Sequence, residues 1–106
     1  MSTAKTETRE TLKTDAAWCI EEIRAQMLTA MKNLRAADAR QAIMRGALRE
    51  TEPPNWSLVG AVKEMLDHTR NLKTAAALIH ENTLKLDNAL TQIETLEKEG
   101  NQCETR

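Results

Sequence analysis

An all-α fold, built as one long antiparallel two-helix hairpin, is predicted by three features of the sequence. The only prolines, Pro53 and Pro54, are adjacent and lie near the middle of the 106-residue chain. On both sides of them, apolar residues recur at alternating steps of four and three, the spacing of coiled coils. Only 2% of the residues are aromatic, with no Phe or Tyr, whereas β-rich cores usually draw on aromatic and β-branched residues.

The first helix is expected over about residues 14–50, after a mobile N-terminal tail at 1–11, within a hairpin that spans 12–99. Its apolar seam keeps the coiled-coil spacing, and nine of its ten positions are apolar. These positions are Ala16, Ile20, Ile23, Met27, Ala30, Leu34, Ala37, Gln41, Met44 and Leu48.

A turn is expected at residues 51–56. Two consecutive prolines remove two backbone donors and keep the preceding residue out of the helical region, so no helix continues through them. Asn55 or Ser57 then offers a side-chain acceptor for the first free amides of a new helix. Trp56 is expected to pack the turn against the helix ends.

The second helix is expected over about 57–99, where Gly100 and Asn101 would end it before a mobile C-terminal tail at 100–106. Nine of its eleven seam positions are apolar, and the two exceptions are Thr, whose hydroxyl can bond back to the helix. The positions are Leu58, Val62, Met65, Thr69, Leu72, Ala76, Ile79, Thr83, Leu86, Leu90 and Ile93.

An antiparallel pairing of these two seams makes a specific prediction for the core. A bend near the prolines places Leu34 beside Leu72, Met44 near Val62 and Met27 near Ile79. These residues are expected to be buried between the two helices of one chain.

Apolar residues beside both seams widen each apolar stripe, which is typical of helices that pack against two neighbours. We expect two copies to form a homodimeric four-helix bundle. A different protein as partner, or a chain folded back into three helices, are the alternatives. Candidate partner contacts outside the seams are Trp18, Leu28, Ile43, Leu78 and Leu84. Trp18 either offers a contact surface on the outer face of the first helix or is covered by the N-terminal tail together with Leu12.

Residues suited to catalysis or metal binding are sparse. His68 and His80 are about 18 Å apart along one helix, so they cannot share a metal ion within one chain. Cys19 and Cys103 form no CxxC pair and are expected to be reduced thiols without a role. We therefore expect no enzyme activity, no metal and no cofactor, and a function in protein–protein interaction, assembly or regulation.

A basic stretch in the first helix supports an alternative function. Residues 24–49 hold six basic residues and one acid, Asp38. The basic residues are Arg24, Lys32, Arg35, Arg40, Arg45 and Arg49. They indicate either a solvated helix with ion pairs between the helices, or phosphate contacts in a small regulator that binds nucleic acid.

The first twenty residues are polar and no stretch of 18 apolar residues occurs, so we expect a cytoplasmic protein that spans no membrane. The run from Asn55 to Gly60, read as Asn-Trp-Ser-Leu-Val-Gly, resembles short stretches in small proteins of bacterial mobile elements. This resemblance covers six residues. It implies a bacterial or phage origin and carries no mechanism.

Overall fold

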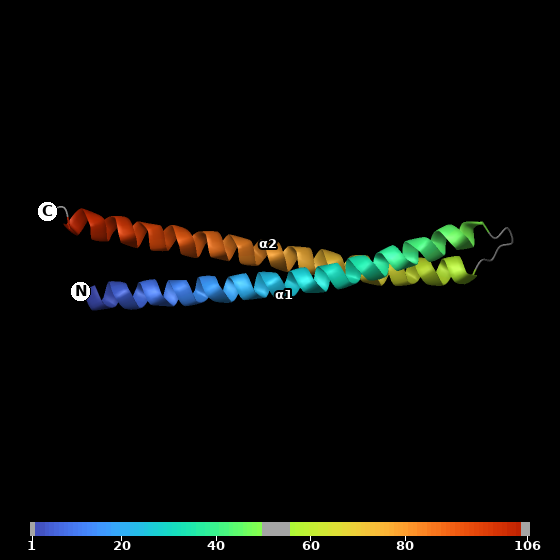
Figure 1. Cartoon of the computed structure of the whole chain (residues 1–106), viewed down its shortest axis with the longest axis horizontal. Helices are drawn as coiled ribbons and strands as arrows, with labels where there is room; N and C mark the ends of the chain where they lie inside the picture. The colour runs from blue at the N-terminus through green and yellow to red at the C-terminus, as the bar shows by residue number, and fades with distance from the viewer. Residues whose placement is uncertain (1, 50–55, 105–106) are drawn as a thin grey trace. The chain divides into compact units, whose positions relative to one another are not determined.

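Two long helices account for the described part of the chain. The structure is a computed structural model that describes residues 2–49 and 56–104, with side chains described at 7–49 and 56–99. Helix α1 spans Ser2–Leu48 and helix α2 spans Trp56–Glu104, and these residues contain no strand. The predicted all-α hairpin is confirmed (Figure 1).

The helix bounds differ from the expected ones mainly at the chain ends. Helix α1 begins at Ser2, well before residue 14, whereas α2 begins at Trp56, one residue from its expected start. Helix α2 continues through Gly100 and Asn101, so the predicted stop is wrong. A glycine inside a helix costs only about 1 kcal/mol relative to Ala, which the helical residues around it can offset. The mobility of both ends stays a prediction, and most of the expected turn lies outside the described residues.

The chain divides into two units, each of which contains part of both helices. The turn unit is Ala25–Leu78, and the terminal unit combines Met1–Arg24 with Ile79–Arg106. Within each unit the segment of α1 runs antiparallel to the segment of α2 (Figure 1).

Buried and half-buried side chains follow the coiled-coil spacing in both units and define the observed seam. In the turn unit the seam consists of Gln26, Ala30, Asn33, Ala37, Arg40, Met44 and Ala47 of α1 and Leu58, Ala61, Met65, His68, Leu72 and Ala75 of α2. In the terminal unit it consists of Leu12, Ala16, Cys19 and Ile23 of α1 and Ile79, Asn82, Leu86, Ala89, Ile93 and Leu96 of α2.

The observed seam shares only every second position with the predicted one. The row from Ala16 to Met44 and the row from Leu58 to Ile93 lie in the seam as predicted. The other predicted row of each helix is exposed. In its place, the seam contains the row of residues that lie one position earlier in the sequence. Leu34, Met27 and Val62 are thus 60%, 52% and 41% exposed, so the prediction that they are buried within one chain is wrong.

The size of the side chains gives a physical reason for this shift. An apolar stripe that includes i, i+3 and i+4 allows either the third or the fourth residue to complete the seam. The observed choice supplies Cys19 and Ala47 in α1 and Ala61, Ala75 and Ala89 in α2, and each of these is buried. Small side chains let two helices approach closely, while larger ones on the neighbouring row remain outside the contact.

The core of the hairpin is thin as a result. Among the described residues, the buried apolar side chains are all Ala or Cys, and no large side chain is fully buried. The single buried polar residue in that set is Asn82 of the terminal unit. Burying an Ala removes much less apolar area from water than burying a Leu or Ile, so the seam alone contributes modest stabilisation.

Candidate protein-interaction surface

A polar cluster lies within the seam of the turn unit. The Oδ1 atom of Asn33 accepts a hydrogen bond from Nδ2 of Asn71 at 3.3 Å and lies 3.4 Å from Nδ1 of His68. His68 is half-buried at the interface between the helices rather than on a flank. A polar group in a coiled-coil seam fixes the register, because any shift would leave it without its partners.

An ion pair one heptad further along α1 gives the same register. Nε of Arg40 lies 2.6 Å from Oε2 of Glu64. The residue numbers of both pairs, Arg40 with Glu64 and Asn33 with Asn71, add up to 104. Seam positions that face each other in this antiparallel pair therefore add up to about 105. In the terminal unit Nη2 of Arg9 donates to Oε1 of Glu97 at 2.8 Å, which fits that alignment.

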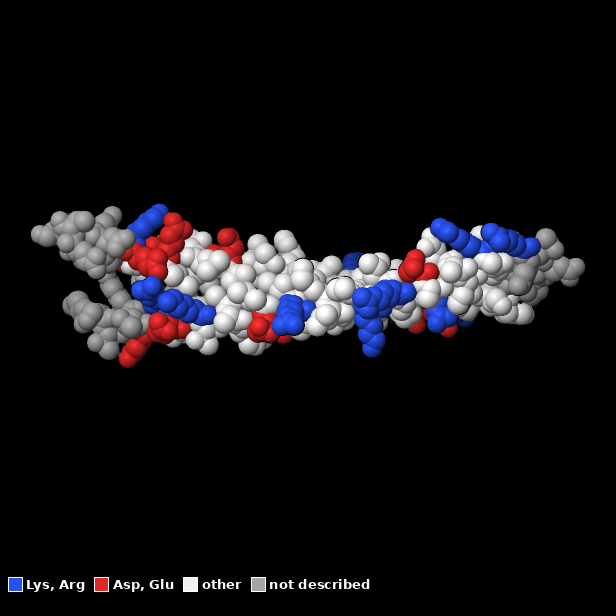
Figure 2. All heavy atoms as spheres, viewed as in Figure 1, with Lys and Arg blue, Asp and Glu red and all other residues white. Residues whose placement is uncertain are grey.

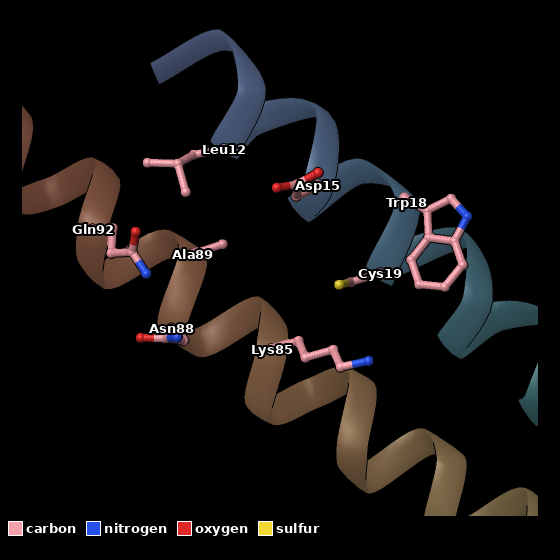
Figure 3. Close-up of a pocket in the computed structure, with 8 residues that line it drawn as sticks. All are labelled: Leu12, Asp15, Trp18, Cys19, Lys85, Asn88, Ala89 and Gln92. Carbon is pink, nitrogen blue, oxygen red and sulfur yellow. The ribbon is translucent and has the colours of Figure 1, made fainter. Parts of the chain in front are cut away.

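A groove in the terminal unit identifies one side of the hairpin as polar (Figure 3). Its volume is about 300 Å³, and Asp15 and Trp18 of α1 line it opposite Lys85 and Gln92 of α2. The remaining lining residues are Leu12, Cys19, Asn88 and Ala89. Asp15 lies four residues before the seam residue Cys19, and Lys85 four residues before Ala89. We call the side of the hairpin that carries the row of Asp15 on α1 and the row of Lys85 on α2 the polar side.

The side opposite to it is the apolar side of the hairpin. On α1 it begins with the row four residues after Ala16, which starts at Ile20, and on α2 with the row four residues after Leu58, which starts at Val62. Two right-handed helices that run antiparallel present equivalent flanking rows on the same side of their contact. The second seam row predicted from the sequence therefore lies on this side in both helices.

In the turn unit, seven large apolar side chains lie on the apolar side and each is 38% to 70% exposed. They are Met27, Met31, Leu34 and Leu48 of α1 and Val59, Val62 and Leu66 of α2. Half-exposed apolar side chains on adjacent rows of two helices are the pattern left when a bundle lacks its second layer. This set of seven residues is the candidate interaction surface.

The polar residues of α1 on this surface pair with one another. With its amide turned so that the oxygen faces Arg45, Gln41 accepts from Nη2 of Arg45 at 3.0 Å and donates to Oδ1 of Asp38 at 3.3 Å. Thr69, on the corresponding row of α2, donates its hydroxyl to the carbonyl of Leu66 at 3.1 Å, as predicted for this Thr. The polar groups between the apolar side chains thus have local partners, which lowers the cost of covering the surface.

The apolar side of the terminal unit is less apolar. Ile20 and Leu90 are 53% and 52% exposed there. The next row of α2, which carries Val59 and Leu66 in the turn unit, carries Asp87 and Glu94 in the terminal unit. This row of α2 is therefore apolar in the turn unit near the turn and acidic in the terminal unit.

Formal charge differs between the units. The turn unit contains eight Lys and Arg against five Asp and Glu, a net charge of +3, and the terminal unit contains seven against eleven, a net charge of −4. On the face drawn in Figure 2, acidic and basic side chains are mixed over the terminal unit, whereas basic side chains predominate over the turn unit. The six basic residues between Arg24 and Arg49 do not form a single face of α1. Arg40 is engaged with Glu64, and Lys32, Arg35 and Arg45 belong to three different rows.

The structure does not bring the five predicted contact residues outside the seams together. Trp18, Leu28, Ile43 and Leu84 are exposed, and Leu78 is half-buried. Trp18 is 59% exposed and lines the groove of the terminal unit together with Leu12. Ile43 and Leu78 lie on the polar side and Leu28 on the outer edge of the apolar side. Trp56 is 74% exposed, and the turn that it was expected to contact lies outside the described residues.

One polar row of α1 lies in the seam although the apolar spacing did not predict it there. Gln26, Asn33 and Arg40 recur every seven residues, in phase with Cys19 and Ala47. That seven-residue spacing indicates a seam row with polar positions. A prediction that counts only apolar residues instead expects such a row to be exposed to solvent. Cross-helix partners such as Asn71 and Glu64 become visible only when the register is known.

Side chains suited to metal binding or catalysis are scattered over the described residues. These residues contain no group of three or more His, Cys, Asp or Glu that could hold a metal ion. Cys19 is a buried free thiol in the seam, and the side chain of Cys103 lies outside the described set. Neither described helix contains a stretch long and apolar enough to cross a membrane.

Comparison with protein-family models, with curated proteins and with solved structures finds no match to this chain.

Proposed function

We propose that this protein is a non-enzymatic assembly protein that acts as a homodimer. The apolar side of the turn unit packs against a second copy, and the resulting four-helix bundle presents its outer surface to other proteins as a regulator or adaptor. The observation that carries this proposal is the set of seven exposed apolar side chains on one side of the turn unit.

The extent of this surface supports association. Fully burying one Val, Leu or Met side chain corresponds to roughly 60 to 120 Å² of apolar area at about 25 cal/mol per Å². Seven such side chains, each about half exposed, offer on the order of 300 Å² before their polar neighbours are counted. Patches of about 300 to 600 Å² are often functional, and polar rims complete the usual area of an interface.

The thin core favours a partner that supplies a second layer of helices. Ala and Cys fill the buried positions, so the larger apolar side chains of this chain gain little from the hairpin alone. A second copy offers the same apolar side, and two-fold pairing of identical surfaces is the commonest route to a soluble oligomer.

Sedimentation equilibrium on the full chain tests this proposal. The wild type is expected to have the mass of a dimer at micromolar concentrations, and Leu34→Lys combined with Leu66→Lys should shift it to the monomer. Ile43→Lys is the matched control, because Ile43 is 42% exposed in the same unit but lies on the polar side. A monomeric wild type, or equal loss of the dimer with the Ile43 variant, would contradict the proposal.

A further inference from the structure

Along α2, the charged residues that border the apolar side differ between the turn unit and the terminal unit. Lys73, in the turn unit, and Asp87, in the terminal unit, lie fourteen residues apart on the row of α2 that carries Val59 and Leu66. Both side chains are exposed, and among the described residues neither forms an ion pair. The apolar side thus carries an unpaired cation in one unit and an unpaired anion in the other.

From this juxtaposition we infer that two copies dimerise with opposite ends together, so that the turn unit of one copy lies on the terminal unit of the other. This inference rests on the homodimer proposed above and specifies its arrangement. In such a pair α2 lies antiparallel to α2 of the second copy. Lys73 of each copy then approaches Asp87 of the other, and two-fold symmetry makes this contact twice.

The net charges favour the same arrangement. Pairing opposite ends brings the unit of charge +3 against the unit of charge −4 in both halves of the dimer. Pairing like ends would bring +3 against +3 and −4 against −4. Juxtaposed like charges disfavour a docking arrangement, while complementary potentials select one.

The contacts of Lys73 also differ between the two arrangements. With like ends together, two-fold symmetry places α2 against α1 of the second copy at the same distance from the turn. Lys73 would then lie near the apolar side chains of Met31 and Leu34 of that copy, because facing positions add to about 105. The opposite-end dimer instead places the carboxylate of Asp87 opposite this lysine.

A charge exchange in the full chain tests the arrangement. Lys73→Glu and Asp87→Lys, measured separately by sedimentation at low salt, should each weaken dimerisation about fivefold to thirtyfold, since each creates two like-charge contacts. The double variant should return the dimer dissociation constant to within about threefold of the wild-type value. Losses that add in the double variant would overturn the opposite-end arrangement.

Spin labels give a second readout. Gly60→Cys, in a chain with Cys19→Ala and Cys103→Ser, carries one label near the turn on the outward face of α2. Opposite-end pairing should give no short distance between the two labels of a dimer, whereas a short distance would overturn the inference. A wild-type chain that is monomeric by sedimentation rejects the proposed function itself, while a dimer with a short label distance rejects only this arrangement.

Discussion

Asn33 and Leu34 are adjacent in the sequence but have different structural roles. Asn33 lies in the seam and bonds to Asn71, while Leu34 is 60% exposed on the apolar side. A hairpin that only maximised burial within one chain would place the leucine inside. The observed choice leaves about half of a large apolar side chain available for association, at a cost of up to about 1 kcal/mol in hydrophobic stabilisation of the single chain.

Leucine-to-alanine variants should distinguish a residue that stabilises the single hairpin from one that supports association. Leu72→Ala removes a half-buried seam side chain and is expected to lower the free energy of unfolding by about 1 to 2 kcal/mol at every protein concentration. Leu34→Ala should lower it by less than about 0.5 kcal/mol at concentrations where the chain is monomeric. It should cost more only where copies associate. Urea unfolding at two protein concentrations measures both, and equal costs in the monomer would restore the seam that the sequence predicted.

Replacing two helical glycines by alanine is expected to increase the free energy of unfolding. A Cβ atom added at Gly46 or Gly60 meets nothing within 4 Å. Gly46→Ala and Gly60→Ala should therefore each raise the free energy of unfolding by about 0.5 to 1 kcal/mol, the difference in helix propensity. Ala39→Gly, at an exposed helical site, is the matched control and should lower it by a similar amount. Destabilisation by Gly60→Ala would mean that another chain approaches this site closely.

At the scale of the helix, each element carries three kinds of row with different roles. The seam joins α1 to α2, the polar side holds groups such as Asp15 and Lys85, and the apolar side remains open in the single chain. Threonines on several rows satisfy their own hydroxyls. Thr83, for example, donates to the carbonyl of Ile79 at 2.7 Å. Such bonds let a small polar residue occupy an apolar row without a partner from another helix.

The sequence predicts the helices, their antiparallel order and half of the seam, and the reason lies in the period. A seven-residue repeat fixes which residues share a row, so Ala30 and Leu72 are assigned correctly. It does not fix which neighbouring row completes the seam when the stripe is wide. That choice depends on the close approach allowed by residues such as Ala75 and on the pairing of Arg40 with Glu64, neither of which is encoded in a count of apolar residues.

Replacement of the central polar residue tests its role in register. Asn33→Leu should raise the melting temperature, because an apolar side chain stabilises a seam more than an amide does. It should also allow other registers, since Asn71 and His68 lose the acceptor that they share. Doubled amide signals in NMR spectra are the expected readout, with the exposed Asn88→Leu as control. A single set of sharp signals in Asn33→Leu would show that other residues fix the register.

For the whole molecule, the thin core and the open apolar side have a common origin. Rows of large side chains that could have closed the hairpin lie one position outside the seam, as with Ile20 beside Cys19. The same displacement that weakens the single chain creates a surface suited to a second one. The wide apolar stripes predicted a partner, and the register shows which side of the hairpin carries the exposed apolar side chains that we propose this partner covers.

Thermal melting as a function of concentration tests whether folding and association are linked. If the dimer unfolds to two separate chains, each tenfold rise in concentration adds about 1.4 kcal/mol per dimer. For a dimer of this size that corresponds to about 3 to 6 °C in melting temperature. The wild type should show this rise, and Leu34→Lys with Leu66→Lys should melt lower and independently of concentration. A wild-type melting temperature that stays constant over a hundredfold range would mean that the hairpin, despite a core of small side chains, is stable alone.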